Sequence, residues 1–408
     1  MKSVILLLCL SLVAGCGGGG FSGTSSLPAP GSLPPPAVLS TGPEACASGS
    51  AGDFSCFGIS LRKRVPLEEM NGTAGNDIWG WVDEQTGNEY ALMGMTNGTA
   101  FVDVTDPENP MFLGKLPTQT VSSVWRDIKV YEDYAYIVAD GAGAHGMQVF
   151  DLTRLRNLAA PQTFSADVVY GNFGNAHNLA INENTGFAYA VGTDTCRGLH
   201  IIDITIPNNP MMAGCHSIFS VHDTQCVSYL GPDTDHADSE ICASSAGDRI
   251  EIVDVTIKGA TVSLSSTMYA QLAYVHQAWL TEDHLFLLVG DEIDELNFAV
   301  PTRTHVFDVS DLDAPVYVFA YDAATSSIDH NLYVLGTRVF QANYTYGLHV
   351  LEFDNLANNA LAEIAFFDTF PGSEAAEFDG AWSVYPYLPS GTILVSDISN
   401  GLFILSLQ

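Results

Sequence analysis

The sequence feature that most limits the possible folds is an internal repeat of about 50 residues. One recurring unit starts with glycine or arginine, continues as a short apolar strand and ends in an acid in six of its seven copies. The copies occupy residues 98–103, 146–151, 198–203, 249–254, 303–308, 347–352 and 401–406. A fixed period of this length indicates that similar supersecondary units are arrayed side by side.

A second unit precedes the first one in every repeat. Its copies are residues 126–130, 177–181, 222–226, 276–280 and 330–334, with 78–82 and 380–384 as the copies in the first and last repeats. With one strand between the two units and one after them, each repeat has four short strands and no long helical period. This pattern predicts an all-β fold, a seven-bladed β-propeller of four-stranded blades over residues 54–408. A β-helix has shorter rungs, and two stacked β-sandwiches would not explain seven near-equal repeats.

The two ends of the repeat region complement each other. The seventh repeat stops at Gln408, directly after its third strand, whereas residues 59–65 read as a strand with no blade of its own. We therefore expect residues 59–65 to supply the fourth strand of the last blade, which would close the ring and remove an open sheet edge.

The N-terminus carries the features of an export signal. Lys2 precedes a short apolar run, and small residues stand directly before Cys16. This matches a lipobox, so residues 1–16 are predicted to be a lipoprotein signal peptide with Cys16 as the lipidated residue. Residue 17 is glycine rather than aspartate, which favours an outer-membrane lipoprotein on the periplasmic or extracellular, cell-surface face. An ordinary cleaved signal peptide is the alternative. Residues 17–53 are rich in Gly, Pro and Ser and are predicted to be a tether.

Charge and cysteine content agree with an exported protein. The chain has 14 Lys and Arg against 47 Asp and Glu, a formal net charge of −33, which excludes a nucleic-acid partner bound through its phosphates. An even number of cysteines remains after the signal, and an oxidising compartment favours disulfides. From their places in the repeats we expect the pairs Cys46–Cys56, Cys196–Cys215 and Cys226–Cys242.

Four motifs resemble a known bacterial family. They are residues 274–283, 329–334, 341–344 and 380–387, together with strand ends such as residues 250–254. The strand ends resemble the LVIVD repeat of bacterial surface proteins, and the motifs resemble the choice-of-anchor B family over roughly residues 54–408. This resemblance implies a propeller held outside the cell by a membrane anchor. It implies no particular activity.

Histidine recurs at the same repeat position in four consecutive repeats, and equivalent positions in a propeller converge on its axis. Imidazoles with carboxylates suit zinc or another transition metal. The candidate metal ligands at the channel mouth are His177, His222, His276, His330, Asp223, Asp291 and Glu292. The candidate ligand-binding residues there are Arg126, Asp127, Asn178, Gln277, Asn331, Asp140, Asp194 and Asn343. A structural role, in which the histidines cap backbone carbonyls, is the alternative.

A second acidic segment lies in a predicted loop on the opposite face. Alternating oxygen ligands can hold calcium, and the candidates here are Asp233, Asp235, Asp238 and Glu240. A solvated acidic turn is the alternative. Three functions remain open from the sequence: a binding module for a glycan, peptide or envelope protein, a metal-dependent hydrolase or lyase, and a passive adhesion or scaffold protein.

Overall fold

The computed structural model describes residues 39–408, and residues 40–408 form one compact unit. Residues 40–53, which the sequence assigned to the tether, therefore belong to this unit. The predicted signal peptide, Cys16 and most of the predicted tether lie outside the described residues. Among residues 39–408, no helix has the length and apolar character needed to cross a membrane.

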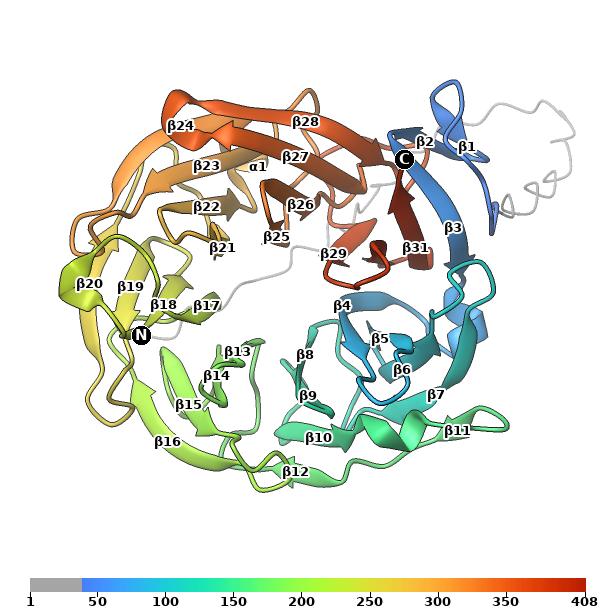
Figure 1. Cartoon of the computed structure of the whole chain (residues 1–408), viewed down its shortest axis with the longest axis horizontal. Helices are drawn as coiled ribbons and strands as arrows, with labels where there is room; N and C mark the ends of the chain where they lie inside the picture. Colours follow the sequence, from blue (N-terminus) through green and yellow to red (C-terminus); the bar gives the residue numbers. More distant parts are fainter. Residues whose placement is uncertain (1–38) are drawn as a thin grey trace, which may run out of the picture. The chain divides into compact units, whose positions relative to one another are not determined.

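Seven antiparallel sheets stand in a ring around a central axis (Figure 1), as the repeats predict. The first strand of each blade lies nearest the axis and the fourth lies at the rim. The protein is thus a seven-bladed β-propeller, almost entirely β. In the described residues the helical segments are α1 (Asp294–Phe298) and the 3-10 turns η1 (Leu67–Met70), η2 (Leu152–Leu155), η3 (Thr234–His236) and η4 (Leu356–Asn358).

The strands follow one another outwards in each blade. Blade 1 consists of β4 (Gly75–Val82), β5 (Glu89–Met95), β6 (Gly98–Asp103) and β7 (Met111–Pro117). Blade 2 consists of β8 (Arg126–Tyr131), β9 (Tyr134–Ala139), β10 (Met147–Asp151) and β12 (Val168–Tyr170). Blade 3 consists of β13 (Asn178–Asn182), β14 (Phe187–Val191), β15 (Leu199–Asp203) and β16 (Met211–His216). Blade 4 consists of β17 (Asp223–Ser228), β18 (Glu240–Ser245), β19 (Ile250–Asp254) and β20 (Val262–Thr267).

The remaining blades have the same order. Blade 5 consists of β21 (Val275–Leu280), β22 (Phe286–Asp291), β23 (Arg303–Asp308) and β24 (Val316–Asp322). Blade 6 consists of β25 (Leu332–Leu335), β26 (Arg338–Ala342), β27 (Leu348–Asn355) and β28 (Ala360–Phe367). Blade 7 consists of β29 (Ala381–Tyr385), β30 (Thr392–Asp397), β31 (Gly401–Leu407) and β3 (Ile59–Val65). Three short strands extend the sheets: β1 (Ser50–Ala51) and β2 (Phe54–Phe57) in blade 6, and β11 (Gln162–Thr163) beside β7 in blade 1.

The ring closes through the pairing predicted from the sequence. Strand β3 runs antiparallel to β31, with Ile59 opposite Leu407 and Val65 opposite Leu402. Ile59 and Leu61 are buried, so the closing strand contributes side chains to the core as well as hydrogen bonds. The N-terminal segment thus satisfies the backbone groups that β31 would otherwise leave at an open edge.

The repeated acid at the end of the third strand has a local structural role. The carboxylate of Asp203 accepts a hydrogen bond from the Thr205 backbone N–H at 2.9 Å, and Asp308 does the same with Ser310 at 2.9 Å. These bonds turn the chain toward the fourth strand. Asp203 and Asp308 are therefore turn residues.

The repeated glycine before the third strand is also a structural requirement. Gly401 has a φ of 93°, and a Cβ there would lie 2.3 Å from the carbonyl oxygen of Val65 on the neighbouring β3. Gly347 has a φ of 82°, and its Cβ would lie 2.2 Å from the Phe367 carbonyl oxygen. Only glycine fits such a close approach with a left-handed backbone.

Three disulfides cross-link the described part of the chain, and all three predicted pairs are confirmed. Cys46–Cys56 joins the N-terminal segment to β2, Cys196–Cys215 links the loop before β15 to β16, and Cys226–Cys242 links β17 to β18. In the last pair the two cysteines stand directly opposite each other, with Cα atoms 4.0 Å apart.

Candidate functional site

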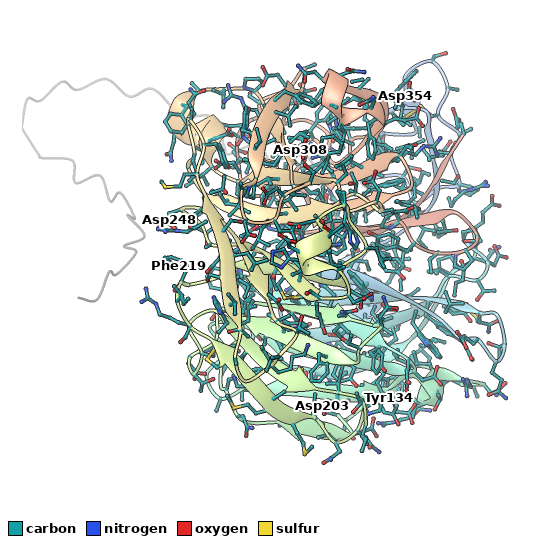
Figure 2. All side chains as sticks on the ribbon, turned by 60° about the vertical axis from the view of Figure 1, so that its left-hand side comes forward. Tyr134, Asp203, Phe219, Asp248, Asp308 and Asp354 are labelled. Carbon is teal, nitrogen blue, oxygen red and sulfur yellow. A yellow bond between two sulfur atoms is a disulfide. The ribbon has the colours of Figure 1, made fainter. Side chains whose placement is uncertain are left out.

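The loops that precede the first strands and the loops between second and third strands open on one face. In blade 4 these loops carry Phe219 and Asp248, which Figure 2 shows on one side of the propeller, away from Tyr134 and Asp354. The guanidinium carbon of Arg249 lies 4.2 Å from the centre of the Phe219 ring, which confirms that the two loops meet. This face contains the channel mouth.

The four repeated histidines lie side by side at the mouth, as their equivalent repeat positions predict. Ring centres are 4.5 Å apart for His177 and His222, 4.4 Å for His222 and His276, and 4.1 Å for His276 and His330. They form an arc contributed by blades 3 to 6, which we call the histidine arc.

Two of these histidines use Nδ1 to connect neighbouring blades. The Nδ1 of His222 lies 3.0 Å from the His276 carbonyl oxygen, and that of His330 lies 2.5 Å from the Trp382 carbonyl oxygen. A carbonyl only accepts, so Nδ1 carries the proton and Nε2 keeps its lone pair. The capping alternative is therefore correct for one nitrogen of each ring, while the other nitrogen is available as a ligand.

Glu292, in the loop after β22, brings a carboxylate close to the Nε2 atoms of His276 and His330. Its Oε2 lies 3.9 Å from the Nε2 of His276 and its Oε1 lies 3.8 Å from the Nε2 of His330. The ligand atoms of these three residues all lie within 4.8 Å of one another. Ligands of one tetrahedral zinc ion lie about 3.3 Å apart, given zinc bonds of about 2.0–2.1 Å. A small inward movement would close this set around a metal ion.

The protonation state of the histidines suits metal binding. Burial, together with the neighbouring imidazoles, lowers the pKa of His276 and His330 to about 3. Both rings are therefore neutral at physiological pH, the form that coordinates metals. The hydroxyl of Tyr344 donates to Glu292 Oε1 at 2.9 Å and fixes this carboxylate from outside. Hydrogen bonds of this kind, from residues that do not themselves bind the metal, orient metal ligands.

The other two predicted carboxylate ligands, Asp223 and Asp291, are held by other hydrogen bonds. Asp223 lies below the arc, where it accepts a hydrogen bond from Gln277 Nε2 at 3.0 Å. Asp291 accepts from the backbone N–H groups of Ala273 and Tyr274 and from the Tyr269 hydroxyl. The nearest grouping of ligand atoms at the mouth thus contains His276, His330 and Glu292 out of the seven predicted residues.

The residue that directly follows Arg126 or a histidine of the arc hydrogen-bonds to the first strand of a neighbouring blade. Asp127 accepts a hydrogen bond from the Leu179 backbone N–H, and Gln277 accepts one from the Leu332 backbone N–H, both at 2.5 Å. Asn178 donates to the His222 carbonyl oxygen at 3.1 Å, and Asn331 donates to the Ser383 hydroxyl at 3.0 Å. Burial raises the pKa of Asp223, in the same layer, to about 6. The structure engages these side chains in holding the blades together, and their predicted role in ligand binding stays a prediction.

The same hydrogen bonds correct the alignment of the first and last repeats. Asp77 accepts from the Ile128 backbone N–H at 3.0 Å, as Asp127 does one blade later, so Asn76 rather than Ile78 is the equivalent of Arg126. In the last repeat the equivalent residue is Trp382 rather than Gly380, because its carbonyl accepts from His330. The pairing of β4 with β5 and of β29 with β30 has a one-residue irregularity close to these positions, after Gly75 and after Ala381.

Lys129 is a buried cation below the histidine arc that the sequence did not single out. Its Nζ lies 2.6 Å from Asp127 Oδ1 and 3.5 Å from Asp77 Oδ2, and 4.5 Å from the centre of the Trp79 ring. Burial by itself would lower the pKa of Lys129, but the two carboxylates outweigh burial and raise it. Farther along the channel, aromatic side chains of four blades meet: Trp79, Trp279, Tyr333 and Tyr385.

Arg126 is almost completely buried, with 2% of its surface exposed. Its Nε donates to the Met95 carbonyl oxygen at 3.1 Å, and Nη1 lies 3.2 Å from His145 Nε2. Burial lowers the pKa of Arg126 to about 10 and that of His145 to about 4, so a cation faces a neutral imidazole. Its Nη2 is buried without a hydrogen-bond partner, and no ion pair of Arg126 occurs within the described part of the chain.

Two rim residues, Asp140 and Asp194, stabilise loops of the mouth face, whereas Asn343 has an unsatisfied side-chain oxygen. Asp140 accepts from His177 Nδ1 at 3.1 Å, and this hydrogen bond is the main reason that the pKa of Asp140 is lowered. Asp194 accepts from the Gly174 backbone N–H at 3.0 Å. The side-chain oxygen of Asn343 is buried and has no hydrogen-bond partner in the part of the chain that is described.

A family comparison places known repeats on this part of the molecule. The model described as the LVIVD repeat matches residues 125–143 and 173–216. These are LVIVD repeats. The two matched segments carry Arg126, Asp140, His177 and Asp194, so the LVIVD repeats supply the mouth residues of blades 2 and 3.

Solved structures similar to this LVIVD-repeat chain share its architecture. A protein of Lactobacillus plantarum is 13% identical over 79% of this chain and 88% of its own, with a TM-score of 0.54. A Bacteroides fragilis protein provisionally assigned as a 6-phosphogluconolactonase is 11% identical over 70% and 82%, with a TM-score of 0.50. The Pseudomonas aeruginosa periplasmic gluconolactonase is 12% identical over 71% and 87%, with a TM-score of 0.47. Curated proteins gave no match. These identities establish similarity of fold alone.

The predicted calcium segment lies on the loop between β17 and β18, away from the LVIVD-repeat mouth. Asp235 and Asp238 are exposed on this turn, and Asp233 accepts hydrogen bonds from the backbone N–H groups of Asp235 and Leu312. Glu240 instead turns into the blade and lies 2.6 Å from Lys258 Nζ. The ligand atoms of Asp233 are grouped with those of His236 and Asp313.

Proposed function

We propose that this protein is a lipid-anchored binding module of the choice-of-anchor B type, exported to the outer membrane, that holds a zinc-class ion at its channel mouth. The anchor would be Cys16. The observation that carries the proposed binding site is the convergence of two neutral imidazoles and one carboxylate, with His276, His330 and Glu292 within 4.8 Å of one another.

The chemistry of this set favours a borderline metal ion. Nitrogen donors with one carboxylate suit zinc, and three protein ligands leave a fourth position for an exogenous donor. Side-chain exposures of 15% for Glu292 and 5% for His330 leave the centre at the bottom of the mouth. A glycan, peptide or envelope protein would bind by placing an oxygen donor in that open position.

The experiment is a measurement of metal content on residues 40–408, the compact unit. We expect about one zinc ion per chain and its loss from the double variant His276→Ala/His330→Ala. His177→Ala is the matched control, because it removes a histidine of the arc outside the three-residue set, and it should retain the metal. A folded wild-type protein that takes up no zinc, nickel or cobalt from buffer would contradict the proposal.

A metal-dependent hydrolase is a second candidate, supported by the same open position. The Tyr344 hydroxyl beside Glu292 could hydrogen-bond to an oxygen that develops charge on a metal-bound substrate. Zinc-loaded protein should then cleave activated esters or lactones, and Tyr344→Phe should reduce turnover while zinc content stays constant. Zinc binding without any such turnover would leave the binding module as the function.

A further inference from the structure

A second group of carboxylates is buried between blades 5 and 6. Asp294 and Glu295 belong to the short helix α1, in the loop between β22 and β23, and Asp329 lies just before β25 of the next blade. Their residue exposures are 0%, 5% and 1%. One oxygen from each lies within 4.8 Å of the others.

The oxygen atoms of this group have no partners. Both carboxylate oxygens of Asp294, Glu295 and Asp329 are buried without a hydrogen bond. The nearest nitrogen atoms of basic side chains are Arg303 Nη1 and His305 Nε2, each 3.8 Å from Asp294 Oδ2, which is too long for a hydrogen bond. Within residues 39–408 no ion pair reaches Glu295 or Asp329. An unpaired buried carboxylate is strongly unfavourable, so three together require a counterion or protons.

The neighbouring Asp291 shows that the fold can satisfy a buried carboxylate here. It accepts two backbone N–H groups and one tyrosine hydroxyl, as described above. Asp294, Glu295 and Asp329 receive no such donors although they lie in the same region. Their oxygens are directed at one another, which is the arrangement expected around a cation.

We propose that Asp294, Glu295 and Asp329 bind a calcium ion that joins blade 5 to blade 6. The donors are oxygens only, which suits hard cations rather than zinc. Calcium accepts several carboxylates in an irregular protein cage, whereas magnesium retains most of its water and requires near-ideal octahedral geometry. The remaining coordination positions would be filled by water or backbone carbonyls.

This ion would also position the channel mouth. Asp329 directly precedes His330, and α1 begins two residues after Glu292. Calcium would therefore fix the loop that carries Glu292 against the strand that carries His330. The inference does not depend on the zinc-class centre, since the two sites differ in ligand atoms and share no residue.

The test is calcium binding to residues 40–408 after treatment with EGTA. Calorimetry with calcium chloride should show one site, and thermal unfolding in millimolar calcium should occur several degrees above that in EGTA. Glu295→Gln/Asp329→Asn should lose both signals. In EGTA, Glu295→Gln alone should be more stable than wild type, because glutamine removes the cost of burying an ionisable carboxyl group.

Controls separate this site from the others. Asp235→Asn, on the acidic turn of blade 4, should retain the calcium-dependent shift, and so should His276→Ala/His330→Ala. If folded wild-type protein shows no heat and no shift, if the shift persists in Glu295→Gln/Asp329→Asn, or if magnesium binds while calcium does not, the proposal is wrong. A calcium shift in a protein that takes up no zinc would contradict the proposed zinc-class centre alone.

Discussion

Asp397, at the end of β30, illustrates how burial alters single residues in this propeller. Its side chain is completely buried, and Oδ1 accepts the backbone N–H groups of Ser399 and Asn400 at 2.9 and 2.7 Å. The second oxygen has no hydrogen-bond partner. Burial raises the pKa of Asp397 to about 7. The folded protein thus keeps a proton that the unfolded chain releases near pH 4.

We predict that Asp397 makes the protein less stable as the pH rises from about 4 to about 7. The unfolded state binds fewer protons in this window, so the contribution of Asp397 to the free energy of unfolding falls by up to about 1.4 kcal/mol per pH unit. Asp397→Asn keeps the Oδ1 acceptor and should remove this slope. Urea unfolding at several pH values measures the difference between variant and wild type, which should grow with pH.

Asp103→Asn is the control, because Asp103 makes a similar turn hydrogen bond to Thr105 from an accessible position. This variant shows the effect of replacing a turn aspartate by asparagine where the side chain is not buried. If Asp397→Asn and wild type had parallel pH profiles, the carboxyl would not be protonated in the folded state.

At the level of elements, the N-terminal segment joins two blades. Strand β2 pairs with β28 in blade 6, and β3 pairs with β31 in blade 7. The Cys46–Cys56 disulfide closes the chain just before β3 and fixes β2 against the segment that precedes it. The same segment therefore fastens the last blade and its neighbour.

We predict that Cys46→Ala/Cys56→Ala lowers the free energy of unfolding by about 2–3 kcal/mol, the effect of opening a short disulfide loop. Denaturant unfolding measures the loss. Cys196→Ala/Cys215→Ala removes a longer loop within blade 3 and should cost at least as much. Proteolysis should distinguish them, with new cleavage before β3 only in the first variant. Equal proteolytic patterns would show that the first disulfide does not secure the N-terminal segment.

The strands and the ring closure could be predicted because they follow from a repeat, whereas the site depends on loops that do not repeat. The histidine arc was predictable, since its four histidines, from His177 in blade 3 to His330 in blade 6, share one repeat position. Glu292 was predicted to reach the rim, but its pairing with His276 and His330 depends on the path of an irregular loop. Asp77 was missed because the first repeat was aligned on Ile78, two residues after Asn76, which the hydrogen bonds show to be the equivalent of Arg126. Asp294 and Asp329 are separated in sequence and meet only through the packing of neighbouring blades.

For the whole molecule, stability rests on cores formed between successive blades. Leu92 and Phe101 of blade 1 pack with Ile137 and Phe150 of blade 2, and the two phenylalanine rings stack with centres 4.7 Å apart. Each blade thus depends on both neighbours, and an open ring would expose two such faces. The closing strand β3 prevents this between blades 7 and 1.

We predict that residues 66–408, which lack β3, fail to form a stable monomer. The unpaired edge of β31 and the apolar surface left by Ile59 and Leu61 should promote association. Size-exclusion chromatography and light scattering would detect oligomers or aggregates. Residues 40–408 are the control and should be monomeric with a single cooperative transition. A stable monomer of residues 66–408 would show that closure by β3 is dispensable.

The pairing of β3 with β31 also determines when the molecule can finish folding. The two strands are about 350 residues apart in sequence, so β3 cannot pair until the final residues of the chain are available. Long-range pairings of this kind form late, because a large loop must close first. If the chain crosses a membrane N-terminus first, the apolar side chains of β3 arrive unpaired and remain so until residues 401–407 emerge. Completed translocation is then the event that allows the propeller to close.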